Sequence, residues 1–284
     1  MTEGALDYSA VKELLREREE KSHKGSFGRL LCLVGSDRYR GAAVLCAKGA
    51  LMCGAGLTAV LSTEKALAAV AAQVPEAILF DATSDLSAAL DYARKSTSAV
   101  IGCGLTDDIT VQKTVSRVIN AVSGTLVIDA DGINMLSENI DLLKELEGKR
   151  VIITPHIGEF SRLTRKPADA ILADRAGVAK SYAEETGFTV ALKSDKTVVA
   201  TPSGEVFVNN LGNSGLAKGG SGDLLSGMIG SFAAMGYSAR DAAFLGVYVH
   251  SRAADLCAEL IPKHSMTASV VAEFIPKAIG ELLI

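Results

Sequence analysis

The chain has 284 residues, of which 48% are hydrophobic and 22% charged, and its net charge at pH 7 is −4. This composition is typical of a folded globular protein and excludes a disordered chain, while the small charge gives no support for a nucleic-acid or membrane partner. The polar, acidic stretch from Met1 to Glu20 does not predict a signal peptide, and no run of about 18 apolar residues predicts a membrane span. Five cysteines without a CxxC pair indicate buried thiols in a reducing compartment, so we expect a cytoplasmic protein.

Short apolar runs alternate with helical patterns in the first half of the chain. Their length and β-branched content predict buried strands at Arg29–Val34, Leu57–Leu61, Ala99–Gly102, Thr125–Asp129 and Arg150–Thr154. Helices are predicted between them at Ala42–Cys53, Leu86–Lys95, Ile109–Val122 and Ile140–Leu146. Such alternation is typical of a mostly parallel sheet with helices on both faces.

The pattern changes after residue 187. Three closely spaced strands are predicted at Phe188–Lys193, Thr197–Ala200 and Glu205–Val208, with a tight turn at 202–204, and they indicate an antiparallel hairpin edge. Long helices are predicted at Gly222–Met235, Ser238–Leu260 and Thr267–Leu283. No linker-like tract or internal repeat interrupts the chain, so we expect one α/β domain over residues 1–284.

The segment 211–223 carries the most chemistry, because it is dense in glycine and leads directly into an apolar helix. Glycine allows backbone N–H groups to approach a ligand, and a helix N-terminus attracts anions. The GxxxxGK[ST] phosphate loop is absent. Asp223 could take a proton from a substrate hydroxyl while neighbouring N–H groups hold a transferred phosphoryl group. The alternative is a glycine-rich turn in which Asp223 caps the helix.

Other candidate residues lie where predicted strands end, which is where α/β sheets bind ligands. The small residues Ala42 and Ala43 would admit a flat ligand, or would serve close packing. His156 is a candidate contact or a structural histidine, and His23, His250 and His264 show no ligand spacing. Asp129 and Asp131 could hold a cation or a hydroxyl, with helix capping as the alternative for Asp131. Lys193 could meet phosphates or could be a surface lysine.

Several separated motifs resemble one family in the family's own order. Residues 213–223 resemble the NxxxAxGGxGD signature of ADP/ATP-dependent NAD(P)H-hydrate dehydratases, and the wider GxGD element is shared with ribokinase-like kinases. Residues 23–29 resemble HKGxxGR, 154–160 resemble TPHxGEF, 129–134 resemble DADALN and 192–197 resemble LKGxxT. The chain departs from the family's GPGLG at Cys103 and Thr106, and from LKGxxT at Ser194.

The resemblance implies a fold, a reaction and a set of site residues. The fold would be a ribokinase-like three-layer α/β/α sandwich, and the reaction would be dehydration of the 6-hydroxy hydrates of NADH and NADPH (NADHX and NADPHX) at the expense of ADP or ATP. Asp223 would be the base, with Gly220 and Gly222 in the anion hole. The expected substrate contacts are Ala42, Ala43, Gly104, Asn134, His156 and Asp223. The expected nucleotide contacts are Lys193, Ser194, Asp195, Lys196, Thr197, Gly219, Ser221 and Gly222. Glu159 would lie near Mg²⁺, through water.

Two other functions compete with this one. A ribokinase-like kinase of a vitamin or small alcohol would keep GxGD, but the TPHxGEF and HKGxxGR matches argue against it. A nucleotide-binding protein without catalysis would have no need of a base at Asp223. The family resemblance further leads us to expect a homo-oligomer, and a separate epimerase that acts on the same metabolite.

Overall fold

The computed structural model describes residues 3–5, 7–106 and 109–284. The described strands form a single ten-stranded sheet in the order β1-β10-β9-β8-β7-β6-β5-β2-β3-β4. Their bounds are β1 Glu3–Ala5, β2 Arg29–Leu33, β3 Leu57–Ser62, β4 Ile78–Asp81, β5 Ser98–Ile101, β6 Thr125–Ile128, β7 Val151–Ile153, β8 Thr189–Leu192, β9 Val198–Ala200 and β10 Val206–Val208.

Fourteen α-helices lie within the described ranges. They are α1 Tyr8–Lys12, α2 Arg40–Met52, α3 Glu64–Gln73, α4 Leu86–Ala93, α5 Ile109–Ala121, α6 Asp131–Glu138, α7 Ile140–Lys144, α8 Ile157–Thr164, α9 Ala168–Ala173, α10 Arg175–Thr186, α11 Ser221–Ala234, α12 Ala239–Ala258, α13 Ala268–Ala272 and α14 Ile275–Leu282. None of these helices is long and apolar enough to cross a membrane.

The sheet has a parallel body and an antiparallel edge. The pairs from β4 through β8 are parallel, whereas β9 runs antiparallel to β8 and β10 antiparallel to β9. The predicted hairpin edge is therefore confirmed. The sequence pattern had not indicated β1, which adds a parallel strand outside β10, with Gly4 opposite Phe207.

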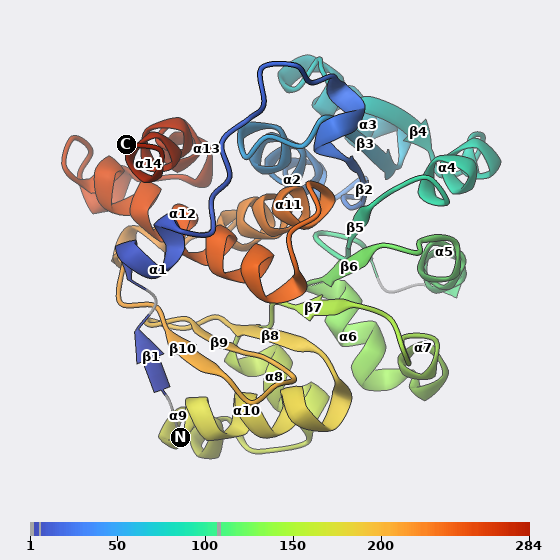
Figure 1. Ribbon diagram of the computed structural model, residues 1–284. Helices are drawn as coiled ribbons and strands as arrows, with labels where there is room; N and C mark the ends of the chain where they lie inside the picture. The colour runs from blue at the N-terminus through green and yellow to red at the C-terminus, as the bar shows by residue number, and fades with distance from the viewer. Residues whose placement is uncertain (1–2, 6, 107–108) are drawn as a thin grey trace.

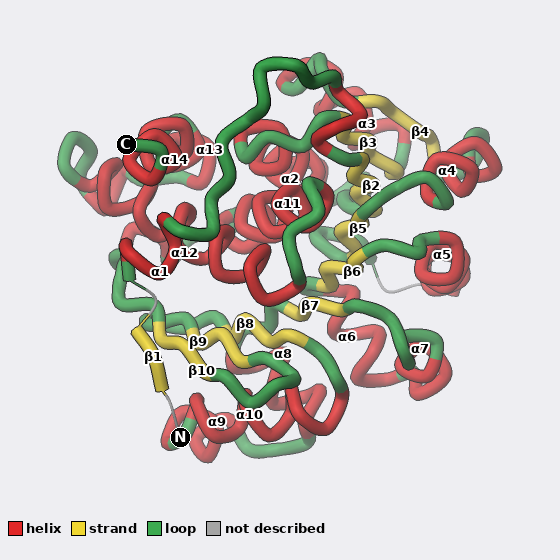
Figure 2. The backbone as a smooth tube through the Cα atoms, viewed as in Figure 1, coloured by secondary structure: helices red, strands yellow, loops and turns green. Residues whose placement is uncertain are grey.

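Two hydrophobic cores lie on the two faces of the sheet, because successive side chains of a strand point to opposite sides. Leu30 and Cys32 of β2 pack with α2, α11 and α12, whereas Leu31 and Leu33 pack with α4, α5 and α6. Figures 1 and 2 show the two helical layers flanking the strands. This is the expected three-layer α/β/α sandwich.

Some elements differ from their prediction. The prediction of one helix over Thr267–Leu283 is wrong, because a turn at Glu273 and Phe274 interrupts the helix between α13 and α14. Pro276 lies in the first turn of α14, where a residue without an N–H begins a helix easily but does not continue one. The sequence pattern also did not predict β4, whose four residues are all half-buried at the sheet edge. Helices α1, α3, α6 and α8 to α10 were likewise not predicted.

The HKGxxGR motif lies at the amino end of β2, away from the strand ends that bind ligands. His23 caps the short 3₁₀ helix Lys24–Phe27 through its Nδ1, which accepts a hydrogen bond from Gly25 N. A Cβ on Gly28 would lie 1.8 Å from the carbonyl oxygen of Ala234 at the end of α11. The motif therefore helps to fix α11 against the sheet.

Candidate functional site

A cavity of about 740 Å³ lies at the carboxyl edge of the sheet. Parallel strands bring their carboxyl ends to the same edge, so Asp129 after β6, His156 after β7 and Lys193 after β8 meet there. The glycine-rich segment 212–222 and the first turn of α11 form the opposite wall. The sequence-predicted residues from four separate motifs are thus gathered in one place.

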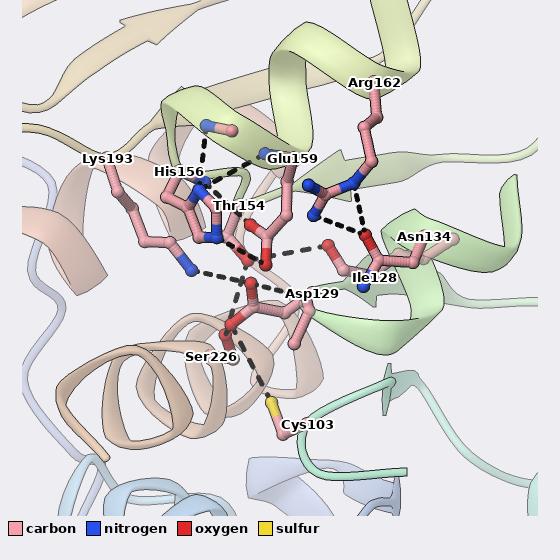
Figure 3. Close-up of polar contacts among 12 residues, drawn as sticks. Cys103, Ile128, Asp129, Asn134, Thr154, His156, Glu159, Arg162, Lys193 and Ser226 are labelled. Carbon is pink, nitrogen blue, oxygen red and sulfur yellow. Dashed lines mark hydrogen bonds and ion pairs between the residues drawn. The ribbon is translucent and has the colours of Figure 1, made fainter. Parts of the chain in front are cut away.

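An ion pair between Lys193 and Asp129 lines the cavity, with Nζ 2.7 Å from Oδ1 (Figure 3). The carboxylate of Asp129 is almost fully buried, and its Oδ2 accepts a hydrogen bond of 2.6 Å from Ser226 Oγ and faces Cys103 Sγ at 3.8 Å. Burial alone would lower the pKa of Lys193, but the carboxylates of Asp129 and Glu159 outweigh it and hold that pKa above its ordinary value. Lys193 therefore remains a cation within the cavity.

The backbone beside this pair adopts a strained conformation. Ala130 has φ 50° and ψ −118°, values that residues with a Cβ rarely adopt. Its N–H donates to Asp129 Oδ1 at 2.8 Å, which helps to keep the carboxylate turned toward Lys193. Strain of this kind persists where surrounding structure holds it, and it commonly occurs at functional sites.

The N-terminus of α11 faces the ion pair. Gly220 is the N-cap residue with φ 95°, a left-handed conformation that favours glycine, and no described side chain caps the helix. A Cβ on Gly222 would lie 3.2 Å from Lys193 Nζ and 3.7 Å from Asp129 Oδ2. The first amides of the helix and the lysine thus surround one small volume, which suits a phosphate or another anion.

Asp223 is in the first turn of α11, but it is not the cap. Its pKa is raised to about 6, mainly by burial and next by the charge of Asp129, while Lys193 acts in the opposite direction. A carboxyl group with this pKa is ionised at neutral pH and is still a better proton acceptor than an ordinary aspartate. This geometry favours the role of a base over the alternative of a structural cap.

His156 and Glu159 form a reciprocal cap at the start of α8 (Figure 3). His156 Nδ1 accepts from the N–H groups of Gly158 and Glu159, so its proton belongs on Nε2, which faces Glu159 Oε1 at 3.3 Å. The other carboxylate oxygen accepts from His156 N at 2.8 Å. Burial, more than the charge of Asp129, raises the pKa of Glu159. Glu159 therefore orients His156, which lines the cavity, whereas the described lining does not include Glu159.

The turn after β8 supplies most of the expected nucleotide contacts. Lys193, Ser194, Asp195 and Thr197 line the cavity, while Lys196 is not part of its described lining. Arg175 of α10 fixes this turn, because it donates to Ser194 Oγ at 3.0 Å and pairs with Asp195. Ser194 Oγ in turn donates to the carbonyl of Lys196 at 2.7 Å. Hydrogen bonds of the Ser194 side chain thus help to hold the turn, at the position where the family pattern has glycine.

Four of the six expected substrate contacts lie outside the described lining of the cavity: Ala42, Ala43, Gly104 and Asn134. Ala42 and Gly104 are neighbours, because a Cβ on Gly104 would lie 2.7 Å from Cβ of Ala42. The Oδ1 of Asn134 accepts two hydrogen bonds from Arg162, at 3.1 and 2.9 Å (Figure 3). The small residues lie at the carboxyl ends of β2 and β5, farther along the same edge of the sheet.

Sequence reasoning missed several residues that complete the site. Ser226 could have been found from spacing, since it follows Asp223 by three residues and shares its face of α11. Arg175 gave no signal, because a surface arginine early in a helix is common. His250 and Ser251 of α12 line the cavity although no motif marked them.

Within the described residues, no group of three or more histidine, cysteine, aspartate or glutamate side chains is arranged to hold a metal ion. The carboxylates of Asp129, Glu159 and Asp223 nevertheless all interact electrostatically with Lys193, and they outnumber Lys193 and Lys218, the two lysines of the described lining. This excess of negative charge, made of oxygen ligands, fits Mg²⁺ that arrives with nucleotide phosphates and retains several waters.

Comparison with known proteins agrees with this geometry. The sequence profile described as NAD(P)H-hydrate dehydratase matches residues 30–277. The chain is 36% identical over 262 residues to the ADP-dependent (S)-NAD(P)H-hydrate dehydratase of Neisseria meningitidis, covering 91% of this chain and 86% of the relative. It is 31% identical to the bifunctional NAD(P)H-hydrate repair enzyme Nnr of Thermofilum pendens, covering 94% of this chain but 53% of that relative, so it spans about half the bifunctional protein.

A solved structure has the same fold over almost the whole chain. It is the ADP/ATP-dependent NAD(P)H-hydrate dehydratase of Bacillus subtilis, co-crystallised with ATP and Mg²⁺. The TM-score is 0.87 at 29% identity, with 99% of each chain covered. With the profile match and the Neisseria relative, this shows that the chain belongs to the NAD(P)H-hydrate dehydratase family.

Proposed function

We propose that this protein dehydrates the 6-hydroxy hydrates of NADH and NADPH and consumes ADP or ATP in doing so. The observation that carries the proposal is the position of Asp223, a buried carboxyl group with a pKa of about 6, beside the N-terminus of α11 and Lys193. Family membership supports the substrate class.

The nucleotide phosphates would lie against the first amides of α11, with Gly219, Gly220 and Gly222 leaving the backbone accessible and Lys193 supplying a positive charge. Lys193 would act as a point charge on the phosphates, and its pair with Asp129 would hold it in position. The turn of Ser194, Asp195 and Thr197 would border the remaining nucleotide. Mg²⁺, when bound, would neutralise phosphate charge, and the residues that would hold it are Asp129 and Asp223, with Glu159 acting through water.

Asp223 would take the proton of the 6-hydroxyl group while the hydroxyl oxygen attacks the terminal phosphorus of the nucleotide. AMP would leave if the nucleotide is ADP, and ADP would leave if it is ATP. The C6–O bond would then break, phosphate would depart, and loss of a proton from the adjacent ring carbon would restore the double bond. Phosphate leaves far more readily than hydroxide, which explains why a nucleotide is consumed.

His156 would contact the hydrated nicotinamide nucleotide from the opposite side of the cavity, in the orientation that Glu159 imposes. Ala42, Ala43, Gly104 and Asn134 lie farther along the carboxyl edge, so they would contact the remote part of the dinucleotide. Binding energy from that remote part would hold the hydroxyl in line for attack. Residues 1–284 would act as one domain, and we infer a cytoplasmic homo-oligomer that works beside a separate epimerase.

The test is an absorbance assay at the reduced-nicotinamide band. Purified protein is mixed with Mg²⁺ and hydrated NADH or hydrated NADPH, with ADP and ATP in separate reactions. We expect a nucleotide-dependent rise that the Asp223→Asn variant loses by at least a hundredfold, because the base is removed. No rise with either nucleotide, from protein shown to be folded, would exclude the dehydratase and favour a kinase of a small alcohol.

A further inference from the structure

His250 is a buried histidine on the wall of the cavity that the mechanism above does not use. It lies in α12, is 6% exposed, and borders the cavity next to Ser251. No hydrogen-bond partner for its Nε2 is present among the described residues. His23 and His156 differ from it, because each uses Nδ1 to cap a helix. The imidazole of His250 interacts with the backbone of Ser221, but its buried Nε2 has no partner among the described residues.

Leaving a buried polar atom without a partner costs free energy, so such atoms are rare unless a ligand or water completes them. Burial, and next the nearby charge of Lys193, lower the pKa of His250 to about 4, against a smaller opposing effect of the Ser221 backbone. The imidazole is therefore neutral at physiological pH. A neutral imidazole has one N–H donor and one acceptor nitrogen, whereas a charged imidazole has two donors and no acceptor. The neutral form can therefore accept a hydrogen bond from a hydroxyl or amine group.

His250 has two chemically different sets of residues around it in the cavity. Lys193 and the backbone of Ser221, the first residue of α11, act directly on the imidazole, and phosphates would bind near them. The lining also includes the apolar residues Leu211, Leu216 and Ala217. Helix α12, which carries His250, packs beside α11 (Figure 1). A nucleotide with its phosphates at α11 would bring its nucleoside part past this histidine.

The neighbouring residue supports this placement. A Cβ on Gly212 would lie 3.4 Å from Ser251 Cβ and 3.4 Å from Leu216 Cδ1, so Ser251 lies near the apolar residues of the lining. Asn209 fixes Ser251 in turn, because its Nδ2 donates to Ser251 Oγ at 2.9 Å and to the Leu211 carbonyl at 3.1 Å. The start of the glycine-rich segment and α12 are thus joined next to His250.

We propose that His250 Nε2 hydrogen-bonds the nucleoside part of the nucleotide that donates the phosphoryl group. The proposal rests on the function proposed above. It adds a residue of α12 that contacts the nucleotide. Its contribution is to nucleotide affinity, and it leaves the reacting phosphorus to Lys193, Asp223 and the α11 amides.

The test measures binding of ADP with Mg²⁺ by calorimetry, in the absence of hydrated NADH. The variants are His250→Leu, His250→Gln as the conservative change, and Tyr248→Phe as a matched buried control on α12. We expect the Leu variant to bind ADP five- to tenfold more weakly, about the effect of one hydrogen bond, and the control to bind as the wild type does. Inorganic pyrophosphate, which lacks a nucleoside, should bind the wild type and the Leu variant equally.

A second readout separates this role from a structural one. Because Nε2 has no partner in the described protein, replacing the imidazole with Leu should leave the melting temperature unchanged or raise it. Weaker ADP binding with unchanged melting supports the proposal, and partial recovery in His250→Gln strengthens it. Melting well below the wild type in both variants assigns His250 a structural role and overturns it.

The outcomes also distinguish this proposal from the proposed function. Equal ADP binding by wild type and His250→Leu would overturn the inference while leaving the dehydratase intact. An equal loss of pyrophosphate binding would show that His250 acts on the phosphates, against the nucleoside assignment. A wild-type protein that binds no ADP would overturn both.

Discussion

Asp223 has an unusually high pKa for an aspartate, and the cause is its surroundings. Burial raises its pKa to about 6, Asp129 adds to that effect, and Lys193 opposes it. In the native protein the carboxylate is therefore costly, since an aspartate exposed in the unfolded chain ionises about two pH units lower. The native protein retains this cost at the position where the proposed mechanism needs a base, and perturbed pKa values of this kind are common at active sites.

The pH dependence of activity follows from this pKa. Because the base must be ionised to accept a proton, kcat/KM should fall as the pH drops through about 6 and reach a plateau above about 7. The measurement is kcat/KM for hydrated NADH from pH 5 to 8 with ADP saturating. Glu159→Gln is the control, and it should keep the same midpoint even if its rate falls. A midpoint near 4, or one that disappears in Glu159→Gln, would show that Asp223 is not the titrating base.

Helix α11 owes its position to close contact with α2. A Cβ on Gly227 would lie 2.0 Å from the carbonyl oxygen of Cys46, and a Cβ on Gly49 would lie 2.5 Å from the carbonyl oxygen of Leu224. Glycine at both sites lets the two backbones approach, so that the first turn of α11 meets Lys193. The contact between α11 and α2 thus fixes the position of the proposed anion site, although this contact lies a turn or more farther along α11.

Gly227→Ala should therefore damage both stability and catalysis. The added methyl group cannot fit without moving a backbone, so we expect a loss of about 2 kcal/mol in the free energy of unfolding. A shift of the α11 N-terminus should also lower kcat by tenfold or more. Urea unfolding and steady-state assays measure the two effects. Gly280→Ala in α14 is the matched control, because its new Cβ meets nothing within 4 Å, and it should be neutral or slightly stabilising. Equal behaviour of the two variants would contradict this account.

At the level of elements, the sequence predicted those strands and helices that are determined by the local pattern of apolar residues. The apolar runs that became β2, β3, β5, β6 and β7 were recognised because they are buried on both faces, whereas β4 was missed because it is half-buried at an edge. The break between α13 and α14 is signalled by Pro276 but was overlooked within an apolar stretch. His250 and Arg175 could not have been predicted, because their roles depend on which helices pack next to the cavity.

For the whole molecule, the order of strands is the property that a linear pattern does not contain. Strand β2 lies between β5 and β3, which places Gly104 beside Ala42 although more than sixty residues separate them. The motifs still predicted one edge of the sheet, because parallel strands share the direction of their carboxyl ends. They did not predict that seven of the eight expected nucleotide contacts would line one cavity, while Ala42, Gly104 and Asn134 lie outside its described lining.

The cavity joins the ends of β6, β7 and β8 to α11 and α12, so a nucleotide bound there contacts segments from much of the chain. A ligand that binds the folded state at 100 times its Kd stabilises it by about 2.7 kcal/mol. For a chain of this size, that should raise the melting temperature by roughly 5 to 10 °C. We expect this shift with ADP and Mg²⁺, measured by thermal unfolding at fixed nucleotide concentration.

Removal of the metal should reduce the shift, because the carboxylates of Asp129, Glu159 and Asp223, which interact with Lys193, would repel the nucleotide phosphates. With EDTA in place of Mg²⁺, we expect ADP to stabilise the protein by less than half as many degrees. Asp223→Asn removes one of the negative charges, so the difference between Mg²⁺ and EDTA should be smaller in that variant than in the wild type. The rise in melting temperature with ADP could instead be the same with Mg²⁺ and with EDTA. That result would show that no cation links the carboxylates to the phosphates. The phosphate charge would then have to be balanced by Lys193 and the α11 amides.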